Sequence, residues 1–211
     1  MVARFVASVI AAYLLGSIPV GLIIGRLRRG VDIRQYGSGK TGATNVMRTV
    51  GYRFGYLTLM LDGVKGAIAV LLATLIVNGG SLAIGSVSLG WQVAQILAGA
   101  GAMVGHNWPV FARFRGGRGV AVFFGTLFAI YPPAGLLGVE VLVILALRSR
   151  HMSLGSVAGT IAVLCLLLPL TVCYGFPLVY FIYCFAVAAL VVYQHRDNIR
   201  RLRQGVERQL W

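Results

Sequence analysis

The sequence predicts an all-α, polytopic integral membrane protein with seven transmembrane helices, two of them short. Its 211 residues are 58% hydrophobic and only 11% charged, which leaves too little polar surface for a soluble globular protein. The apolar residues form runs, several of which reach the roughly 20 residues that span a bilayer. Basic residues are concentrated in alternate gaps between these runs. We therefore expect one transmembrane domain over residues 1–211.

The distribution of basic residues predicts the orientation. Of the 19 Lys and Arg residues, only Arg4 and Lys65 lie outside four clusters. These clusters occupy positions 26–53, 113–118, 148–150 and 196–208, whereas the intervening gaps at 78–81, 131–133 and 174–175 contain none. Because Lys and Arg concentrate in cytoplasmic loops, we expect an external N-terminus and a cytoplasmic C-terminus. Every Gly-rich, polar and His-containing loop then lies on the cytoplasmic face.

The seven expected spans follow in order along the chain. They cover residues 2–25, 54–77, 82–104, 119–130, 134–147, 154–173 and 176–193. Small residues at Gly16, Gly21 and Gly25 favour close helix contact in the first span. The fourth and fifth spans are too short to cross comfortably. Such helices are tolerated where they border protein or a water-filled cavity.

Two charged features lie at or inside the spans. Asp62 and Lys65 are three residues apart in the second span and are expected to form an ion pair, because an unpaired charge in lipid is costly. Residues 196–211 combine arginines with apolar residues at three- and four-residue steps. This tail is expected to be a basic amphipathic segment in the headgroup layer, with a solvated anchor helix as the alternative.

The first basic loop has the residues of a phosphate-binding turn. Gly37 and Gly39 permit close backbone approach, so that successive N–H groups can form an anion nest. Ser38 adds a hydroxyl donor and Arg48 adds positive charge. The nucleotide-binding pattern G-x-x-x-x-G-K-[ST] is not satisfied. We favour a phosphate cradle over a plain Gly-rich loop.

The second basic cluster lies where the short fourth span begins. Gly116, Gly117 and Arg118 precede this helix, and the oriented N–H groups and positive dipole at a helix start favour an anion. His106 lies 10 to 12 residues before them in the sequence. A histidine at a helix end is more often a structural hydrogen-bonding group than a base. The turn is therefore a second candidate anion site.

Two further segments supply polar side chains on the same predicted face. Ser153 stands where a helix N-cap is expected, and a hydroxyl that reaches a phosphate is an equally good interpretation. His195 and Asn198 follow the last span and are three residues apart, so they share one side of a helix. Both can therefore point into one site.

Five motifs together resemble those of the PlsY family, the bacterial inner-membrane acyl-phosphate:glycerol-3-phosphate acyltransferases. The motifs are Gly37-Ser-Gly-x-x-Gly-Ala-Thr-Asn45-x-x-Arg48-x-x-Gly51, Asp62-x-x-Lys65-Gly66, Gly105-His106-x-x-Pro109-x-Phe111-x-x-Phe114-x-Gly116-Gly117, Ser153-Leu154, and His195-Arg196-x-Asn198-Ile199-x-Arg201-Leu202-x-x-Gly205-x-Glu207. They occur in order and extend over most of the chain. Two positions depart from the family pattern, which has Lys where Arg118 stands and an uncharged residue where Lys40 stands.

The resemblance implies a reaction and its residues. An acyl chain moves from acyl phosphate to the 1-hydroxyl of glycerol 3-phosphate, which gives lysophosphatidic acid and phosphate in phospholipid biosynthesis. The implied catalytic residues are His195, Asn198 and Ser38. The implied substrate-binding residues are Arg48, Arg118, Ser153, Gly37, Gly39, Asn45, Gly116, Gly117 and His106. The enzyme is expected in the bacterial inner membrane, with its active site on the cytoplasmic side.

Partners and alternatives follow from these observations. The expected partners are acyl phosphate, glycerol 3-phosphate and membrane lipid, with no nucleic acid, no cofactor and no metal ion. The net charge of +14 suits anionic headgroups and substrates. The alternative function is a membrane transporter for an organic phosphate or other anion. It is disfavoured because the polar motifs gather at one face and no inverted repeat is visible.

Overall fold

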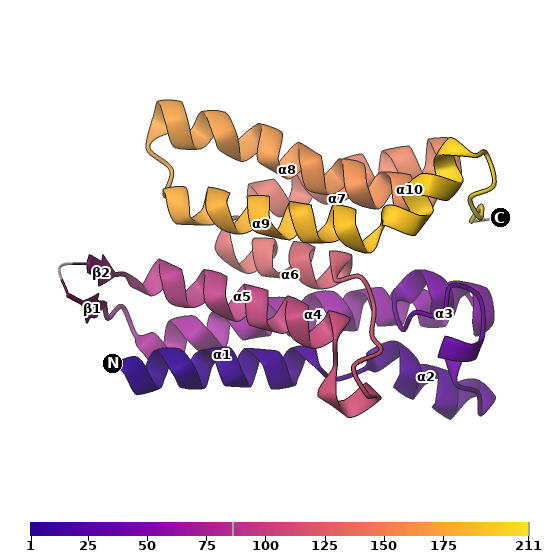
Figure 1. The fold of residues 1–211 in the computed structure, drawn as a ribbon, viewed down its shortest axis with the longest axis horizontal. Coiled ribbons are helices and arrows are strands. Elements are labelled where there is room, and N and C mark those ends of the chain that lie inside the picture. The colour runs from indigo at the N-terminus through magenta and orange to yellow at the C-terminus, as the bar shows by residue number, and fades with distance from the viewer. Residues whose placement is uncertain (86, 211) are drawn as a thin grey trace. The chain divides into compact units, whose positions relative to one another are not determined.

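The computed structural model describes residues 1–85 and 87–210, and most of them are helical (Figure 1). The chain divides into two compact units, Met1–Ile130 and Tyr131–Trp211. The helices of the first unit are α1 Val2–Gly16, α2 Val20–Arg29, α3 Ala43–Thr49, α4 Tyr52–Val77, α5 Trp91–Asn107 and α6 Val120–Ile130. Those of the second are α7 Pro132–Ser149, α8 Met152–Tyr174, α9 Leu178–Gln194 and α10 Arg196–Arg203. Each predicted apolar run therefore contains a helix.

In the first unit, α4 is the central helix and packs against α1, α5 and α6. Glycines make these contacts close. A methyl group at Gly16 would overlap the backbone of Ala102 in α5, and one at Gly125 in α6 would overlap the backbone of Gly63 in α4. Helix association in a membrane depends on such close packing, because lipid supplies no hydrophobic driving force between helices. The predicted small-residue contact of the first span is confirmed at Gly16.

The first predicted span is interrupted in the structure. α1 ends at Gly16 and α2 begins at Val20, with Pro19 between them. Proline lacks a backbone N–H and cannot continue the hydrogen-bond ladder of a helix. The two helices together still form one candidate span of 28 residues, Val2–Arg29.

The prediction for residues 82–104 is wrong at its beginning. Strands β1 Leu82–Ile84 and β2 Val87–Leu89 pair antiparallel, and α5 begins only at Trp91. Gly85, between the strands, has a φ of +59°, which glycine adopts without steric cost. The chain is therefore mostly helical rather than all-α.

In the second unit, α8 packs against α7 and α9. α10 follows α9 after a bend of 58°. The tail is helical only to Arg203, because Gly205 adopts a φ of +69° and ends the turn. The amphipathic helix is thus shorter than the predicted segment 196–211, of which Trp211 lies outside the described residues.

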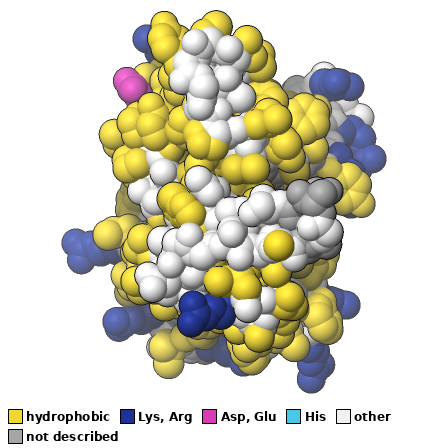
Figure 2. Space-filling model, turned by 90° about the vertical axis from the view of Figure 1, so that its left-hand side faces the viewer, with side chains coloured by type: hydrophobic (Ala, Val, Ile, Leu, Met, Phe, Trp, Pro, Cys, Tyr) yellow, Lys and Arg dark blue, Asp and Glu magenta, His cyan; other side chains and the backbone are white. Residues whose placement is uncertain are grey.

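The apolar exterior fits a protein embedded in lipid. Large hydrophobic side chains on α4 are exposed, including Met60 at 66% and Leu75 at 73%. Hydrophobic side chains also cover much of the surface in the space-filling view (Figure 2). Within the described residues, four helical segments are long and apolar enough to cross a membrane, or five if α9 and α10 count as one bent span. Seven crossings and the orientation of the termini remain predictions.

Candidate active site

The first unit contains the Gly-rich loop at 37–42, and Asn45 in α3 organises it. The Asn45 side chain is 2% exposed. Its amide group donates to three loop carbonyls, those of Ile33 at 2.8 Å, Tyr36 at 3.2 Å and Lys40 at 2.8 Å. Its Oδ1 accepts from the backbone N–H of Ser38 at 3.0 Å. Asn45 therefore shapes the turn that presents Ser38, and its direct contact with substrate remains a prediction.

The second Gly-rich turn is held by the end of α5. The N–H of Gly116 donates to the carbonyl of Asn107 at 3.2 Å, and the N–H of Gly117 donates to the carbonyl of His106 at 3.1 Å. A methyl group at Gly117 would overlap Nε2 of the His106 ring. The His106 imidazole therefore lies directly behind the turn that leads through Arg118 into α6.

The two Gly-rich loops are joined within this unit. The N–H of Thr41 donates to the carbonyl of Gly116 at 3.4 Å. The Arg34 guanidinium donates to the carbonyl of Ala112 at 2.8 Å and pairs with Asp32 at 2.6 Å. Hydrogen bonds from Arg34 lower the pKa of Asp32 to about 2. The two Gly-rich loops are thus in direct contact, through one bond between backbone groups and one from the Arg34 side chain.

A buried charge network lies behind the second turn. The Lys65 ammonium is 2.8 Å from Oδ1 of Asp62, which confirms the predicted ion pair. It also donates to the carbonyl of Ile18 at 3.0 Å, in the break between α1 and α2. Nδ1 of His106 lies 3.5 Å from the same Asp62 oxygen. Because Asp62, Lys65 and His106 are at most 6% exposed, the charges of Asp62 and Lys65 depend on these neighbours rather than on water.

The second unit holds another group of predicted residues, assembled around Glu207. The Glu207 side chain is 4% exposed. It accepts hydrogen bonds from the Ser153 hydroxyl at 2.9 Å, from the Asn198 amide and from the Arg201 guanidinium at 2.7 Å. Burial by itself would raise the pKa of Glu207, but the hydrogen bonds from Asn198, Arg201 and Ser153 lower it. The carboxylate therefore stays ionised and ties α8 to α10.

This arrangement bears on one of the two interpretations of Ser153, its role as a helix N-cap. The N-cap of α8 is His151, and Ser153 lies inside the helix with its hydroxyl bonded to Glu207. The N-cap interpretation is therefore wrong. Sequence reasoning assigned no role to Glu207, because its three partners lie at different distances along the chain.

The hydrogen bonds of His195 and Asn198 determine which of their atoms can accept a proton or hydrogen bond. Nδ1 of His195 lies 2.8 Å from the carbonyl of Val191, and a carbonyl only accepts, so Nδ1 carries the proton. Nε2 is then the basic atom of the neutral ring. The Asn198 amide N–H donates to Glu207, which turns Oδ1 away from that carboxylate. Within the described residues, this buried oxygen has no hydrogen-bond partner.

The proposed phosphate-binding side chains Ser38, Arg48 and Arg118 are more exposed than His195 and Asn198. Arg48 in α3 is exposed, and Ser38 and Arg118 are half-buried. Ser38, Arg48, Arg118 and the glycines belong to the first unit, whereas Ser153, His195 and Asn198 belong to the second. Within the described residues, no group of three or more His, Cys, Asp or Glu side chains is placed to hold a metal ion. The arginines and the Ser38 hydroxyl of the first unit suit an anion.

Comparisons with known proteins agree with this chemistry. The profile of the glycerol-3-phosphate acyltransferase family matches residues 6–205. Glycerol-3-phosphate acyltransferase 3 of Dehalococcoides mccartyi strain CBDB1 is 47% identical over 100% of this chain and 97% of its own length. The glycerol-3-phosphate acyltransferase of Synechococcus elongatus is 41% identical over 98% of this chain and 95% of its own length.

Two solved structures are similar over nearly the whole fold. Both are crystal structures of PlsY (YgiH), an integral membrane glycerol 3-phosphate acyltransferase, in a glycerol 3-phosphate form and a lysophosphatidic acid form. Each is 36% identical in sequence and covers 97% of this chain and 94% of the solved one. The TM-scores are 0.85 and 0.82.

Proposed function

The chain belongs to the glycerol-3-phosphate acyltransferase family and acylates glycerol 3-phosphate in phospholipid synthesis. From this premise we propose that acyl phosphate is the acyl donor. We also propose that the acyl chain passes directly from donor to acceptor, with no acyl-enzyme intermediate. Two features carry the proposal: the joined Gly-rich loops that bear Ser38 and two arginines, and a histidine whose Nδ1 is occupied by a carbonyl. The first suits phosphate groups. The second suits a hydroxyl that must lose a proton.

The first unit supplies the phosphate-binding groups. Ser38, Arg48 and Arg118 stand on or beside the two turns, and the turns are anchored by buried Asn45 and His106. The anchored turns hold these side chains in place, so they can meet an anion with little reorganisation, which is the condition under which such donors accelerate a reaction most. Arg118 is proposed to stabilise charge on the departing phosphate.

The second unit supplies the groups that handle the acceptor hydroxyl. Nε2 of His195 is the atom that would accept the proton from the 1-hydroxyl of glycerol 3-phosphate. Oδ1 of Asn198 would accept a hydrogen bond from a substrate hydroxyl, and Glu207 holds the Asn198 amide in that orientation. The hydroxyl oxygen then attacks the carbonyl carbon of the acyl phosphate.

The reaction balances without a covalent enzyme intermediate. The new ester C–O bond forms as the bond between the acyl carbon and the phosphate oxygen breaks, and inorganic phosphate leaves with the bonding electrons. Acyl phosphate is already activated, so positioning and charge neutralisation suffice. The Ser38 N–H is bonded to Asn45, and within the described residues no histidine is recorded at its hydroxyl.

Assays of the purified protein test which compound is the acyl donor and whether the acyl transfer is direct. We expect turnover of glycerol 3-phosphate with acyl phosphate and little or none with acyl-CoA. Mass spectrometry of protein quenched during turnover should detect no acyl ester on Ser38. Faster turnover with acyl-CoA would overturn the donor, whereas a kinetically competent acyl-Ser38 would overturn direct transfer alone.

The same proposal places the enzyme in the bacterial inner membrane with a cytoplasmic active site. The clusters of basic residues support this orientation through the positive-inside rule. Single cysteines introduced beside Arg48 and beside Gly79, in a variant that lacks Cys165, Cys173 and Cys184, test it. The first should be protected from an impermeant thiol reagent in intact cells, and the second should be labelled. The reverse pattern would overturn the orientation.

A further inference from the structure

Helix α10 has two faces with different roles. One face carries Asn198 and Arg201, which bond to Glu207. Another carries Arg196, Arg200 and Arg203, which repeat at steps of four and three residues. Their side chains therefore leave the helix on one side, although their long ends diverge. The proposed reaction uses none of these three arginines, although they are exposed.

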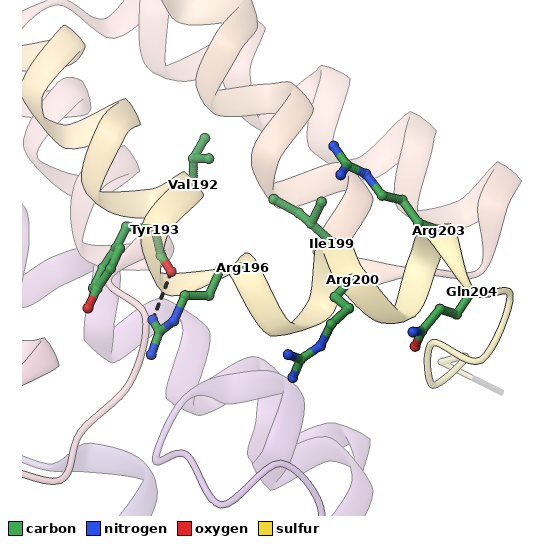
Figure 3. A pocket seen from close by; sticks show the side chains of 7 residues that line it. All are labelled: Val192, Tyr193, Arg196, Ile199, Arg200, Arg203 and Gln204. Carbon is green, nitrogen blue, oxygen red and sulfur yellow. Dashed lines mark hydrogen bonds between the residues drawn. The ribbon is translucent and has the colours of Figure 1, made fainter.

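The arginine face lines a cavity at the bend between α9 and α10. The cavity has a volume of about 540 Å³, within the roughly 300–1,000 Å³ typical of small-molecule sites. Its lining includes Val192, Tyr193, Ile199, Arg196, Arg200 and Arg203. In Figure 3, the side chains of Arg196 and Arg200 extend to one side of α10, and those of Ile199 and Arg203 extend to the other. The cavity therefore combines an apolar strip with flanking positive charges.

The positive charges of this cavity are little compensated. The Arg196 guanidinium lies 4.4 Å from the centroid of the Tyr193 ring and donates to the Tyr193 carbonyl at 3.0 Å (Figure 3). This contact orients the cation without neutralising it. Arg200 pairs with Asp197 at 3.1 Å, but both side chains are more than half exposed, so the pair is weak and readily exchanged. Among the described residues, no carboxylate forms an ion pair with Arg196 or Arg203.

The position of the cavity indicates what would occupy it. α9 is a 17-residue apolar helix with exposed side chains such as Ile182, Phe185 and Val192. The arginines begin where this helix ends, as expected at a boundary between hydrocarbon and headgroups. A free phosphate would use the charges but not the apolar strip. An anionic amphiphile matches both.

We propose that the Arg196, Arg200 and Arg203 face of α10 binds the phosphate of an anionic phospholipid of the surrounding bilayer. The lipid's apolar part lies along Val192 and Ile199, and its phosphate lies among the guanidinium groups. The bound lipid holds α10 at the membrane surface and thereby supports the opposite face, where Asn198 is presented.

Native mass spectrometry of the full-length protein tests this site. Protein in detergent is incubated with equimolar phosphatidylglycerol and phosphatidylcholine, and the retained lipid is identified. The variant combines Arg196→Gln, Arg200→Gln and Arg203→Gln. The matched control removes the same number of exposed charges elsewhere, through Arg26→Gln, Arg29→Gln and Arg53→Gln.

Wild type and control should retain phosphatidylglycerol preferentially, and the triple variant should bind it at least about tenfold more weakly, because each arginine near an anionic lipid contributes roughly fivefold. Equal retention by the triple variant, or equal loss in the control, would overturn the site. Displacement of the lipid by excess inorganic phosphate would mean that the cavity is a simple anion site. Displacement by acyl phosphate alone would assign the cavity to the donor. Either displacement overturns the phospholipid assignment, and none of these outcomes depends on transferase activity.

Discussion

Arg118 is half-buried and stands where α6 begins. We expect Arg118→Ala to lower kcat/KM by about 30-fold or more, because loss of a charge partner from a partly desolvated phosphate costs about 2–5 kcal/mol. Arg118→Lys should be much milder, since it keeps the charge and loses only the two-pronged geometry. Initial rates with acyl phosphate and glycerol 3-phosphate measure both.

The two substitutions distinguish charge from backbone binding. Nearly full activity in Arg118→Ala would mean that the Gly-rich turn holds phosphate through its N–H groups alone. Equal loss in both variants would mean that the bidentate geometry of arginine is indispensable. Either outcome would contradict the role proposed for the charge.

At the scale of elements, the turn before α6 is defined by its contact with α5. Gly117→Ala should lower activity by roughly 10- to 100-fold, because the added methyl group meets the His106 ring and small displacements of a positioned group have effects of this size. Gly63→Ala in α4 is the matched control, since its methyl group would meet its nearest neighbour at an ordinary 3.6 Å. Kinetics and thermal unfolding of both variants test this. Unchanged activity in Gly117→Ala would show that the turn does not need His106 behind it.

Glu207 makes the corresponding connection between α8 and α10. Glu207→Gln should lower both the melting temperature and the activity, because loss of a hydrogen bond to a charged group costs about 1.5–3 kcal/mol. Asp197→Asn removes a carboxylate from α10, but from an exposed pair worth about 0–1 kcal/mol, and should change little. Thermal unfolding in detergent and initial rates measure both variants. A Glu207→Gln protein as stable and active as Asp197→Asn would contradict the proposed clamp.

At the scale of the whole molecule, the carboxylates of Asp32 in the first loop and Glu207 in the tail predict that the folded protein loses stability in acid. The pKa of Asp32 falls from 3.8 to about 2 on folding, and that of Glu207 also falls from its ordinary 4.5. A pKa lowered by folding stabilises the protein above the unfolded value, and the contribution is lost as the pH falls. For Asp32 the loss should occur between about pH 4 and pH 2.

Asp32→Asn provides the test of this pH dependence. The variant should be less stable than wild type at pH 7, and the difference should shrink as the pH falls toward 2. Thermal unfolding in detergent over this range measures it. A constant difference at every pH would mean that Asp32 acts through packing rather than through its charge.

Some of this architecture follows from local sequence features. Each apolar run contains a helix, and the Asp62–Lys65 pair forms within one turn of α4, because both depend on near neighbours in the chain. The beginning of α5 was missed because residues 82–89 are apolar enough for a helix, while Gly85 and the pairing of two strands favour a hairpin. Hydrophobicity alone does not distinguish these outcomes.

The candidate site likewise combines features that local sequence predicts with features that depend on the fold. Motif chemistry proposes Ser38, His195 and Asn198 as catalytic residues, but it does not separate groups that face substrate from groups that hold the loop. Asn45 resembles a ligand in sequence, yet its side chain bonds to four backbone groups of its own loop. Which hydrogen bonds an amide makes depends on the path of the backbone around it.

The sequence by itself determined the membrane environment, the helical character and the reaction class, because hydrophobicity, charge and motif chemistry are properties of each segment alone. Only the tertiary structure decided that Glu207 joins Ser153, 54 residues away, to Asn198, and that Lys65 caps the break beside Ile18, 47 residues away. A buried charge must find partners wherever the folded chain brings them. Those partners are set by helix packing, which no single segment encodes.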